Sequence, residues 1–381
     1  MNFEPDFIVI GGGFAGLTFA NVAANKNKKV LIIERRNHIG GNSYDCYDSH
    51  GILVHLYGPH IFHTNHKEVF DYLSSFDEFI KYEHKVLGNI DGVLVPIPFN
   101  FTSLEKLLPT KASTLKEKLL SKYKKDSRVS IFDLLNDDDE MIKEFGNYVF
   151  EKVFAHYTAK QWGTTIDKVD TSVINRVPVV LGYNDLYFSD KYQFMPKKGF
   201  TNLFERMIDN ENIKIMLSTD ANELVSLKDG KILFEDKLFI GKVIYTGEID
   251  ALFNFKYGRL PYRSLNLKFE HINKTNFQTN SVVNYLTSEK FTRITEFKYL
   301  TGQSAEGKTT ILKEYPLFSS DNNEAFYPIQ NAINFEKYNK YISLANNYKN
   351  LYLLGRLAEY KYYNMDIVVK NALNLAADLT K

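Results

Sequence analysis

The chain has 381 residues, of which 44% are hydrophobic, and this length predicts two or three packed domains of about 150 residues each. Lys and Arg number 47 and Asp and Glu number 46, so the net charge of +1 excludes a strong overall field that would attract nucleic acid or a membrane surface. The single cysteine, Cys46, excludes an internal disulfide bond and a metal site built from several thiolates.

The N-terminal segment predicts a strand, a helix and a second strand in succession. Phe7–Ile10 is a short apolar run, Phe14–Ala24 carries small residues on one side, and Lys29–Ile33 is a second apolar run. This order is typical of a βαβ unit. The acidic start of the chain lacks the basic segment of a signal peptide, and no stretch approaches the ~18 apolar residues of a membrane span. We therefore expect a cytoplasmic protein.

Gly11, Gly13 and Gly16 form the pattern Gly-x-Gly-x-x-Gly between the first strand and the helix, and Glu34 follows the second strand. In such a site the first glycine permits a tight turn, the second lets the backbone approach a pyrophosphate, and the third lets helix and strand pack closely. The helix N-terminus offers N–H groups to the phosphates, and the acidic side chain accepts hydrogen bonds from ribose hydroxyls. With these features in register, we favour dinucleotide binding over a glycine-rich turn.

The residues after Glu34 indicate a flavin dinucleotide rather than a nicotinamide dinucleotide. Arg35 and Arg36 are followed by the glycine pair Gly40-Gly41 and then Asn42. This order resembles the extended fingerprint of flavoproteins. There the second glycine pair lets the chain pass close to the pyrophosphate and the flavin. NADP would use one of the arginines for its 2′-phosphate, but Glu34 would repel that phosphate.

The middle of the chain predicts helices and then antiparallel strands. Residues 103–154 carry leucines and aromatic residues at helical spacing, and the acidic run Asp137–Glu140 fits a solvated loop or a helix N-terminus better than a metal site. Strands are expected at residues 263–270, 281–286, 292–297 and 309–315. The other predicted elements are a helix at Gly199–Ile208, strands at Ile213–Leu217, Lys231–Phe234, Val243–Tyr245 and Tyr352–Leu354, and a last helix at Met365–Leu379.

Three longer blocks resemble one enzyme family. They are Lys160-Gln161-Trp162-Gly163, Tyr187-Phe188-Ser189-Asp190 and the run from Gly355 to Tyr363, which reads GRLAEYKYY. With these blocks the chain resembles the prokaryotic UDP-galactopyranose mutases over nearly its whole length.

The resemblance implies an α/β protein with a Rossmann-like FAD-binding domain, a helical insertion domain with a mobile loop, and an antiparallel β-sheet domain. We expect the FAD-binding domain to be assembled from residues 1–85, 206–255 and 336–381. The helical domain would comprise residues 86–165, and the sheet domain residues 166–205 and 256–335.

The resemblance also implies an isomerase that converts UDP-galactopyranose to UDP-galactofuranose without net redox change. FAD is the implied cofactor and must be reduced, because its N5 attacks the anomeric carbon and expels UDP. We further expect an external reductant, a homodimer, no nucleic-acid partner and a role in cell-surface polysaccharide biosynthesis. A flavin oxidoreductase of the amine-oxidase type and a non-catalytic nucleotide-sugar binder are the competing hypotheses.

By the family pattern, the catalytic residues are Arg176, Arg293 and His63, and the two arginines neutralise the diphosphate of the leaving group. The expected substrate contacts are Phe154, Tyr157, Thr158, Trp162, Arg176, Tyr187, Arg293, Tyr327, Tyr363 and Asn364. The expected cofactor contacts are Gly11, Gly13, Phe14, Ala15, Gly16, Glu34, Arg35, Gly41, Asn42, His60, Ile61, Gly247, Arg356 and Met365.

Some of these residues also fit plainer roles. Trp162 fits the core as well as the cleft, and Arg176 could form an ion pair at a strand edge. His60 and His63 are three residues apart but lack a carboxylate cluster nearby, so we expect no metal site.

The chain departs from the family pattern at three positions near the expected sugar. Pro59 stands where a small residue is usual, Asn364 where aspartate is common, and Leu186 where asparagine is common. A related sugar nucleotide therefore stays open as a substrate, namely UDP-N-acetylgalactosamine, dTDP-fucose or UDP-arabinopyranose. An apolar contact at Leu186 would suit a sugar that lacks a hydroxyl.

Overall fold

A five-stranded parallel sheet organises one end of the molecule, in a computed structural model that describes residues 3–162, 177–320 and 323–381. Its strands are β1 (Phe7–Ile10), β2 (Val30–Ile33), β12 (Ile213–Met216), β16 (Lys242–Tyr245) and β22 (Leu351–Leu353). They are ordered β12-β2-β1-β16-β22, and every neighbouring pair is parallel. Strands from three separated parts of the sequence thus meet in one sheet.

Strands β1 and β2 are apolar and buried at every position because both faces of the sheet are covered there. Val9 on β1 belongs to a core shared with three helices, whereas Ile8 belongs to a core on the opposite face, beneath a small antiparallel sheet. The helices are α1 (Phe14–Ala24), α9 (Phe200–Met207) and α13 (Met365–Leu379). The small sheet consists of β13 (Val225–Lys228), β14 (Lys231–Phe234) and β15 (Lys237–Leu238).

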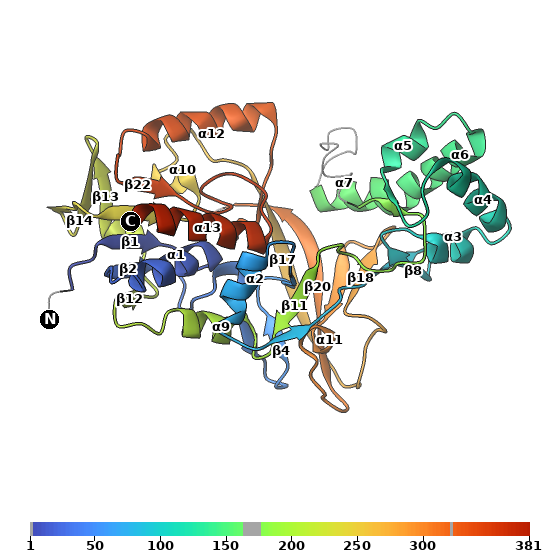
Figure 1. Ribbon diagram of the computed structural model, residues 1–381, viewed down its shortest axis with the longest axis horizontal. Helices are drawn as coiled ribbons and strands as arrows, with labels where there is room; N and C mark the ends of the chain where they lie inside the picture. The colour runs from blue at the N-terminus through green and yellow to red at the C-terminus, as the bar shows by residue number, and fades with distance from the viewer. Residues whose placement is uncertain (1–2, 163–176, 321–322) are drawn as a thin grey trace.

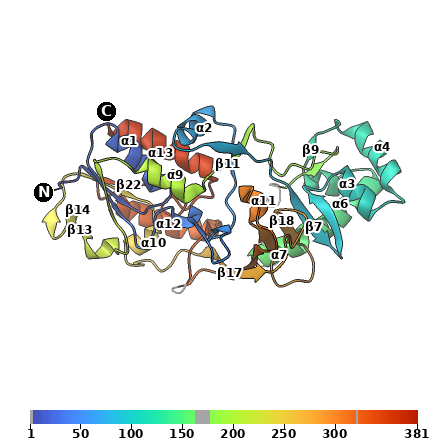
Figure 2. The same ribbon diagram turned by 90° about the horizontal axis from the view of Figure 1, so that it is seen from below.

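Helices α1 and α13 pack against each other over the parallel sheet, as Figures 1 and 2 show. Small residues such as Ala20 and Ala372 in their shared core allow this close packing. Helix α1 begins after Gly13 and α13 begins after Asn364, and neither residue provides a side-chain hydrogen bond to cap its helix. Both helix N-termini therefore have backbone N–H groups that require other partners.

A seven-stranded sheet forms the middle of the molecule (Figure 1). Its strands are, in spatial order, β21 (Tyr327–Pro328), β17 (Tyr262–Ile272), β20 (Thr309–Phe318), β19 (Arg293–Glu296), β18 (Val282–Tyr285), β7 (Val86–Ile90) and β8 (Val93–Ile97). All neighbours pair antiparallel except β18 and β7, which are parallel. The sheet is therefore predominantly antiparallel.

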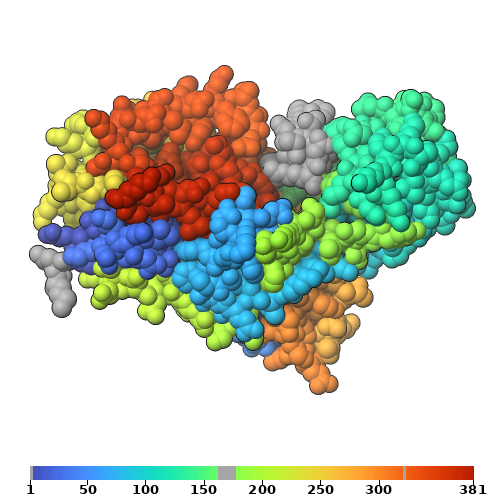
Figure 3. Space-filling model, viewed as in Figure 1, coloured from blue at the N-terminus to red at the C-terminus, as the bar shows by residue number. Residues whose placement is uncertain are grey.

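A helical lobe stands at the end opposite the parallel sheet (Figures 1 and 3). It contains α3 (Phe101–Leu107), α4 (Ala112–Lys122), α5 (Ile131–Leu135), α6 (Glu140–Val149) and α7 (His156–Trp162), and the π-helical turn Phe150–Ala155 joins α6 to α7. Its side chains form a separate core. Asp139 caps α6 by accepting N–H bonds from Met141 and Ile142, which confirms the helix N-terminus expected for the acidic run.

The remaining elements connect these three parts. A hairpin is formed by β3 (Asp45–Tyr47) and β4 (Leu53–His55), and a small sheet by β5 (Phe62–Thr64), β11 (Tyr192–Pro196) and β6 (Phe79–Lys81). Strand β9 (Arg128–Val129) pairs with β10 (Val179–Val180). The other helices are α2 (Lys67–Ser74), α10 (Ile249–Leu252), α11 (Lys298–Thr301) and α12 (Ala332–Ala345).

The fold is α/β, and the predicted helices at Phe14–Ala24 and Met365–Leu379 are confirmed with the same bounds. Residues 86–97, expected in the helical domain, form β7 and β8, which pair within the seven-stranded sheet and pack in the core of the helical lobe. In residues 166–205, strands β10 and β11 pair outside that sheet, because strand pairing depends on long-range contacts that local patterns do not encode. The domain boundaries stay predictions.

Within the described residues, none of the helices combines the length and the apolar character that a membrane crossing requires.

We predict that Phe204→Ala lowers the free energy of unfolding by about 3–5 kcal/mol. The Phe204 ring is fully buried and meets the Phe14 ring edge-on at a centroid distance of 4.6 Å, so its loss leaves a cavity between α9 and α1. Urea unfolding followed by circular dichroism measures the change. Phe335→Ala, at a position 37% exposed, is the matched control and should change stability far less. Equal effects of the two substitutions would contradict the prediction.

Candidate functional site

A cavity of about 790 Å³ opens at the carboxyl ends of the parallel strands. Ile10, Ile33 and Tyr245, which end β1, β2 and β16, contribute to its wall. The N-terminus of α1 and Met365 at the start of α13 face the same space. The carboxyl edge of a parallel sheet is where α/β proteins bind nucleotides, because helix N-termini converge there.

Two glycines of the motif serve different purposes. A Cβ on Gly16 would lie 2.1 Å from the carbonyl oxygen of Gly11, so this glycine permits the close packing of α1 on β1. A Cβ on Gly13 would meet only the Cα of Gly41, at an ordinary 3.7 Å. The protein by itself therefore tolerates a side chain at Gly13, and the bare backbone there leaves room for a ligand beside the uncapped N-terminus of α1.

Glu34 is 6% exposed and lies at the wall of this cavity. Its carboxylate accepts N–H bonds from Gly12 at 2.7 Å and from Arg36 at 2.9 Å, one on each oxygen. These bonds fix the carboxylate, and each oxygen retains a lone pair for a further donor such as a ribose hydroxyl.

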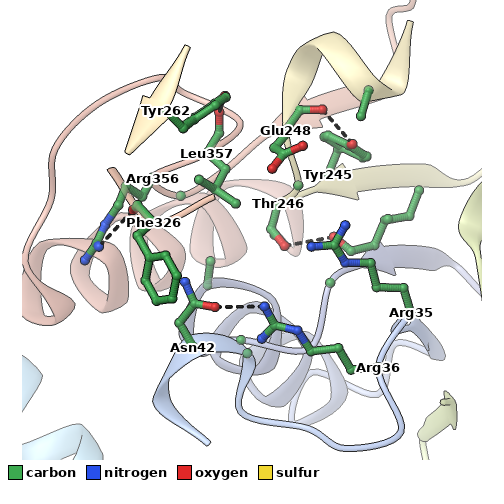
Figure 4. Close-up of a pocket in the computed structure, with 18 of the residues that line it drawn as sticks. Arg35, Arg36, Asn42, Tyr245, Thr246, Glu248, Tyr262, Phe326, Arg356 and Leu357 are labelled. Carbon is green, nitrogen blue, oxygen red and sulfur yellow. Dashed lines mark hydrogen bonds between the residues drawn. The ribbon is translucent and has the colours of Figure 1, made fainter. Parts of the chain in front are cut away.

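The neighbouring arginines are already engaged. Arg35 and Arg36 share one carboxylate oxygen of Glu324, at 2.6 and 2.7 Å, and Arg36 also donates to the Asn42 side chain at 2.9 Å (Figure 4). Glu324 offsets one of the two positive charges and engages both guanidinium groups, which makes the arginines less available to a 2′-phosphate. The structure thus adds a second argument against NADP.

A second cavity, of about 300 Å³, lies between the seven-stranded sheet and the helical lobe. Arg293 on β19 donates to the hydroxyl of Tyr157 on α7 at 2.8 Å, and its Nε lies 3.6 Å from a carboxylate oxygen of Glu314 on β20. Burial raises the pKa of the Glu314 carboxyl. An ion pair that is incompletely hydrogen-bonded and placed in a cleft is suited to receive a charged ligand.

Several polar atoms around this cavity are buried and lack a hydrogen-bond partner. They are Arg293 Nε, Glu314 Oε1, Asn284 Oδ1, and Nε and Nη1 of Arg263. Leaving such atoms unpaired costs about 1–3 kcal/mol each, so they indicate that the cleft is completed by a polar ligand.

The two cavities share His60, Arg356 and Met365 in their walls. Arg356 donates to the carbonyl oxygens of Phe326 and Tyr363, which holds its guanidinium at the junction (Figure 4). If the phosphates of a dinucleotide lie at α1, the end of the dinucleotide away from the Glu34 ribose site would point toward this junction. That end would lie between the N-terminus of α13 and a ligand in the second cavity.

The histidines near the junction are neutral at physiological pH. Burial lowers the pKa of His60 to about 3 and that of His84 to about 3, and it lowers the pKa of His55 to about 4. His60 and His84 line the second cavity. They can therefore offer hydrogen bonds and ring surfaces there, but not a positive charge.

The cavities collect most of the site residues expected from the sequence. The first is lined by Gly11, Gly13, Phe14, Ala15, Glu34, Arg35, Gly41, Asn42, His60, Gly247, Arg356 and Met365. The second is lined by Ile61, His63, Phe154, Tyr157, Thr158, Tyr187, Arg293, Tyr327 and Asn364. Arg176 lies outside the described residues, as does the side chain of Trp162 at the end of α7.

The geometry adds detail to three expectations. Gly16 is in neither wall; it packs against the Gly11 backbone, as expected for the third glycine of the motif. Tyr362, not Tyr363, lines the second cavity, where it stacks on Tyr327, while the Tyr363 hydroxyl donates to Glu359 at 3.1 Å. Leu186 is absent from both walls and lies beside Lys85, so it gives no reason to expect a sugar that lacks a hydroxyl.

The residues of the second cavity that the sequence analysis missed include His84, Arg263, Asn284 and Glu314. Each is a polar residue within or beside a strand, with no motif around it. A polar residue inside an apolar strand pattern was the one available signal, and it does not specify which face the residue occupies.

Comparisons with known proteins find relatives that match nearly the whole chain. A family model described as UDP-galactopyranose mutase matches residues 152–362, and one described as an NAD(P)-binding Rossmann-like domain matches residues 9–76. The chain is 37% identical to the UDP-galactopyranose mutase of Mycoplasma genitalium, covering 98% of this chain and 94% of that protein. It is 32% identical to the dTDP-fucopyranose mutase of Escherichia coli, covering 97% of each. A crystal structure of reduced UDP-galactopyranose mutase has a TM-score of 0.69 at 16% identity, covers 98% and 93% of the two chains, and shows a shared fold.

We predict opposite outcomes for two alanine substitutions in the glycine motif. Gly16→Ala should lower the free energy of unfolding by about 1–3 kcal/mol, because the new Cβ clashes with backbone. Gly13→Ala should change the free energy of unfolding of the cofactor-free protein by less than about 1 kcal/mol. The same substitution should weaken dinucleotide affinity by roughly tenfold, about 1.4 kcal/mol. Urea unfolding and a fluorescence titration with FAD separate the two effects. Loss of stability in Gly13→Ala would contradict the assignment.

We also predict that the protein loses stability as the pH falls from about 6.5 to 5. The unfolded chain protonates its histidines near pH 6.5, whereas buried His55, His60 and His84 stay neutral until about pH 3–4. The unfolded state therefore binds more protons in this window, and each histidine contributes a slope of up to about 1.4 kcal/mol per pH unit. Urea midpoints measured across the window check this, and His84→Phe should flatten the slope. An unchanged slope in that variant would contradict the burial argument.

Proposed function

Because the chain belongs to the UDP-galactopyranose mutase family, we propose that it interconverts the pyranose and furanose forms of a nucleotide sugar, with UDP-galactopyranose and UDP-galactofuranose as the leading pair. The observation that carries this proposal is the junction of the two cavities. A dinucleotide site at the parallel sheet and a polar cleft beside Arg293 share His60, Arg356 and Met365, so a cofactor ring and a sugar can meet there.

The family implies a flavin cofactor, and we propose that it is FAD in the reduced state. The first cavity fits this cofactor, since Glu34 is fixed to accept ribose hydroxyls and the uncapped N-terminus of α1 can bind the pyrophosphate. Reduced FAD would supply a nucleophile at N5, which would displace UDP from the anomeric carbon and be displaced in turn when UDP returns, so no net redox change would result. Met365 and the N-terminus of α13 would face the pyrimidine end of the flavin ring, where they favour negative charge.

The residues of the chain would bind the leaving group and orient the sugar. Arg293 would give charge-assisted hydrogen bonds to the diphosphate, with Tyr157 and Tyr327 beside it in the cleft wall. Arg176, outside the described residues, is proposed as the second diphosphate ligand. The ring of Phe154 and the hydroxyl of Thr158 are proposed to hold the uridine.

Galactose remains the preferred sugar, although a mutase from Escherichia coli named for dTDP-fucopyranose is among the relatives. The buried and unpaired Asn284 Oδ1 in the cleft requires a donor, and a sugar with its full set of hydroxyls offers more donors than a deoxy sugar. Asn364, where the family commonly has aspartate, lines the same cavity and can donate as well as accept.

An external reductant, a homodimer, a cytoplasmic location and a product used in cell-surface polysaccharides complete the proposal, by family resemblance.

The test is turnover of UDP-galactofuranose by the purified protein with dithionite, followed by chromatography, beside the UDP-N-acetylgalactosamine, dTDP-fucose and UDP-arabinose pairs. We expect a yellow protein that converts UDP-galactofuranose fastest and works only when reduced. Failure to interconvert every pair would sink the proposal. Substrate-dependent peroxide production in air would instead indicate an amine-oxidase-type enzyme, and a colourless protein that binds UDP-galactose would indicate a non-catalytic binder.

We predict that Arg293→Ala lowers kcat/KM by about 30- to 1,000-fold, because a diphosphate loses about 2–4 kcal/mol of charge-assisted bonding. Arg293 lies outside the dinucleotide cavity, so the flavin content should be unchanged. Arg206→Ala, at a position on α9 paired with Asp77, is the control and should retain full activity. Loss of flavin from Arg293→Ala would mean that the cleft has been misplaced.

A further inference from the structure

His63 and Asp190 form a hydrogen-bonded pair at the wall of the second cavity. The Nδ1 atom of His63 lies 3.0 Å from Oδ2 of Asp190, and the two side chains are 12% and 21% exposed. His63 belongs to β5, opposite Gln193 on β11, and Asp190 precedes β11. The Gln193 side chain donates to the carbonyl oxygens of Phe188 and Asp190, which fixes the turn that carries the carboxylate.

Asn65 determines which groups of this pair donate. The backbone N–H of Lys191 donates to Asn65 Oδ1 at 2.9 Å, and a backbone N–H can only donate. The amide nitrogen of Asn65 therefore points the other way, where it donates to Asp190 Oδ1 at 2.9 Å. A carboxylate oxygen can only accept, so Asp190 Oδ2 accepts from His63 and Nδ1 of His63 carries the proton.

The opposite nitrogen of His63 is free to contact a ligand. Within the described part of the chain, no residue forms a hydrogen bond with His63 Nε2, and His63 lines the second cavity beside Tyr187 and Asn364. The His63 ring stacks on Phe188 at a centroid distance of 3.6 Å and an interplanar angle of 14°. The carboxylate and the stacked ring together hold the imidazole in one orientation.

We propose that Asp190 is a positioning residue that holds the proton of His63 on Nδ1, so that Nε2 presents a hydrogen-bond acceptor to a sugar hydroxyl in the cleft. The identity of the hydroxyl donor rests on the proposed function, whereas the tautomer does not. The block Tyr187–Asp190 thereby serves two purposes, since Tyr187 lines the cleft and Asp190 orients a second side chain in it.

Asp190→Asn tests the tautomer directly. Asn65 still donates to Oδ1, so the new amide must place its carbonyl oxygen there and its NH₂ group against His63. Nδ1 of His63 would then have to accept, and the proton would move to Nε2. The substitution keeps the size of the side chain while reversing the hydrogen-bond character that His63 presents to the cleft.

The measurement is the ¹⁵N NMR spectrum of the flavin-containing protein labelled in histidine, with His63→Gln used to assign the His63 signals. We expect Nδ1–H with unprotonated Nε2 in the natural protein, the reverse in Asp190→Asn, and no change in Asp71→Asn, an exposed control on α2 paired with Lys67. A doubly protonated or Nε2–H ring in the natural protein, or an unchanged tautomer in Asp190→Asn, overturns the proposal.

Kinetics test the sugar contact separately. With flavin content and melting temperature unchanged, Asp190→Asn should lower kcat/KM for the preferred sugar nucleotide on the order of tenfold, because a hydroxyl that should donate to Nε2 now meets a donor. A reversed tautomer with unchanged kcat/KM overturns the sugar contact. If the natural protein turned over none of the sugar nucleotides, the proposed function would fail while the tautomer result would still be decided by the spectra.

Discussion

The fold depends on one constraint: the N-cap residues of α1 and α13, Gly13 and Asn364, provide no side-chain cap, and both helix ends face the cavity at the carboxyl edge of the parallel sheet. Uncapped helix ends are costly unless a ligand satisfies them. The close packing of α1 on β1, which Gly16 permits, brings the first of these ends to the sheet edge. An anionic dinucleotide is the ligand that such an arrangement favours.

The second cavity adjoins the first at His60, Arg356 and Met365. Its walls come from the seven-stranded sheet and the helical lobe, and they contain buried polar atoms without partners, at Arg263, Asn284, Arg293 and Glu314. These unpaired atoms lower the stability of the ligand-free protein, and a polar ligand that forms hydrogen bonds with them offsets this loss. The chain thus divides the work. In the proposed function, the parallel sheet would bind the cofactor, and the other two parts would bind a charged substrate beside it.

Neutral histidines fit this division. Burial keeps His60 and His84 uncharged, and Asp190 fixes the orientation of His63, so the cleft wall offers oriented hydrogen bonds rather than proton transfer. A nucleophile supplied by a cofactor removes the need for a protein base to generate one. Among the charged groups that line the second cavity in the described residues, the guanidinium of Arg293 is proposed to meet the diphosphate of the leaving group.

The sequence by itself determined the features that local rules govern. Glycine spacing specified the turn before α1, apolar periodicity specified the helices, and contiguous motifs specified the family. Tertiary structure alone decided that Tyr362 rather than Tyr363 faces the cleft, and that Glu314 lies beside Arg293. It also decided that β7 and β8 join the seven-stranded sheet. The physical reason is that these outcomes depend on strand pairing and side-chain direction between distant segments, which no local pattern of residues encodes.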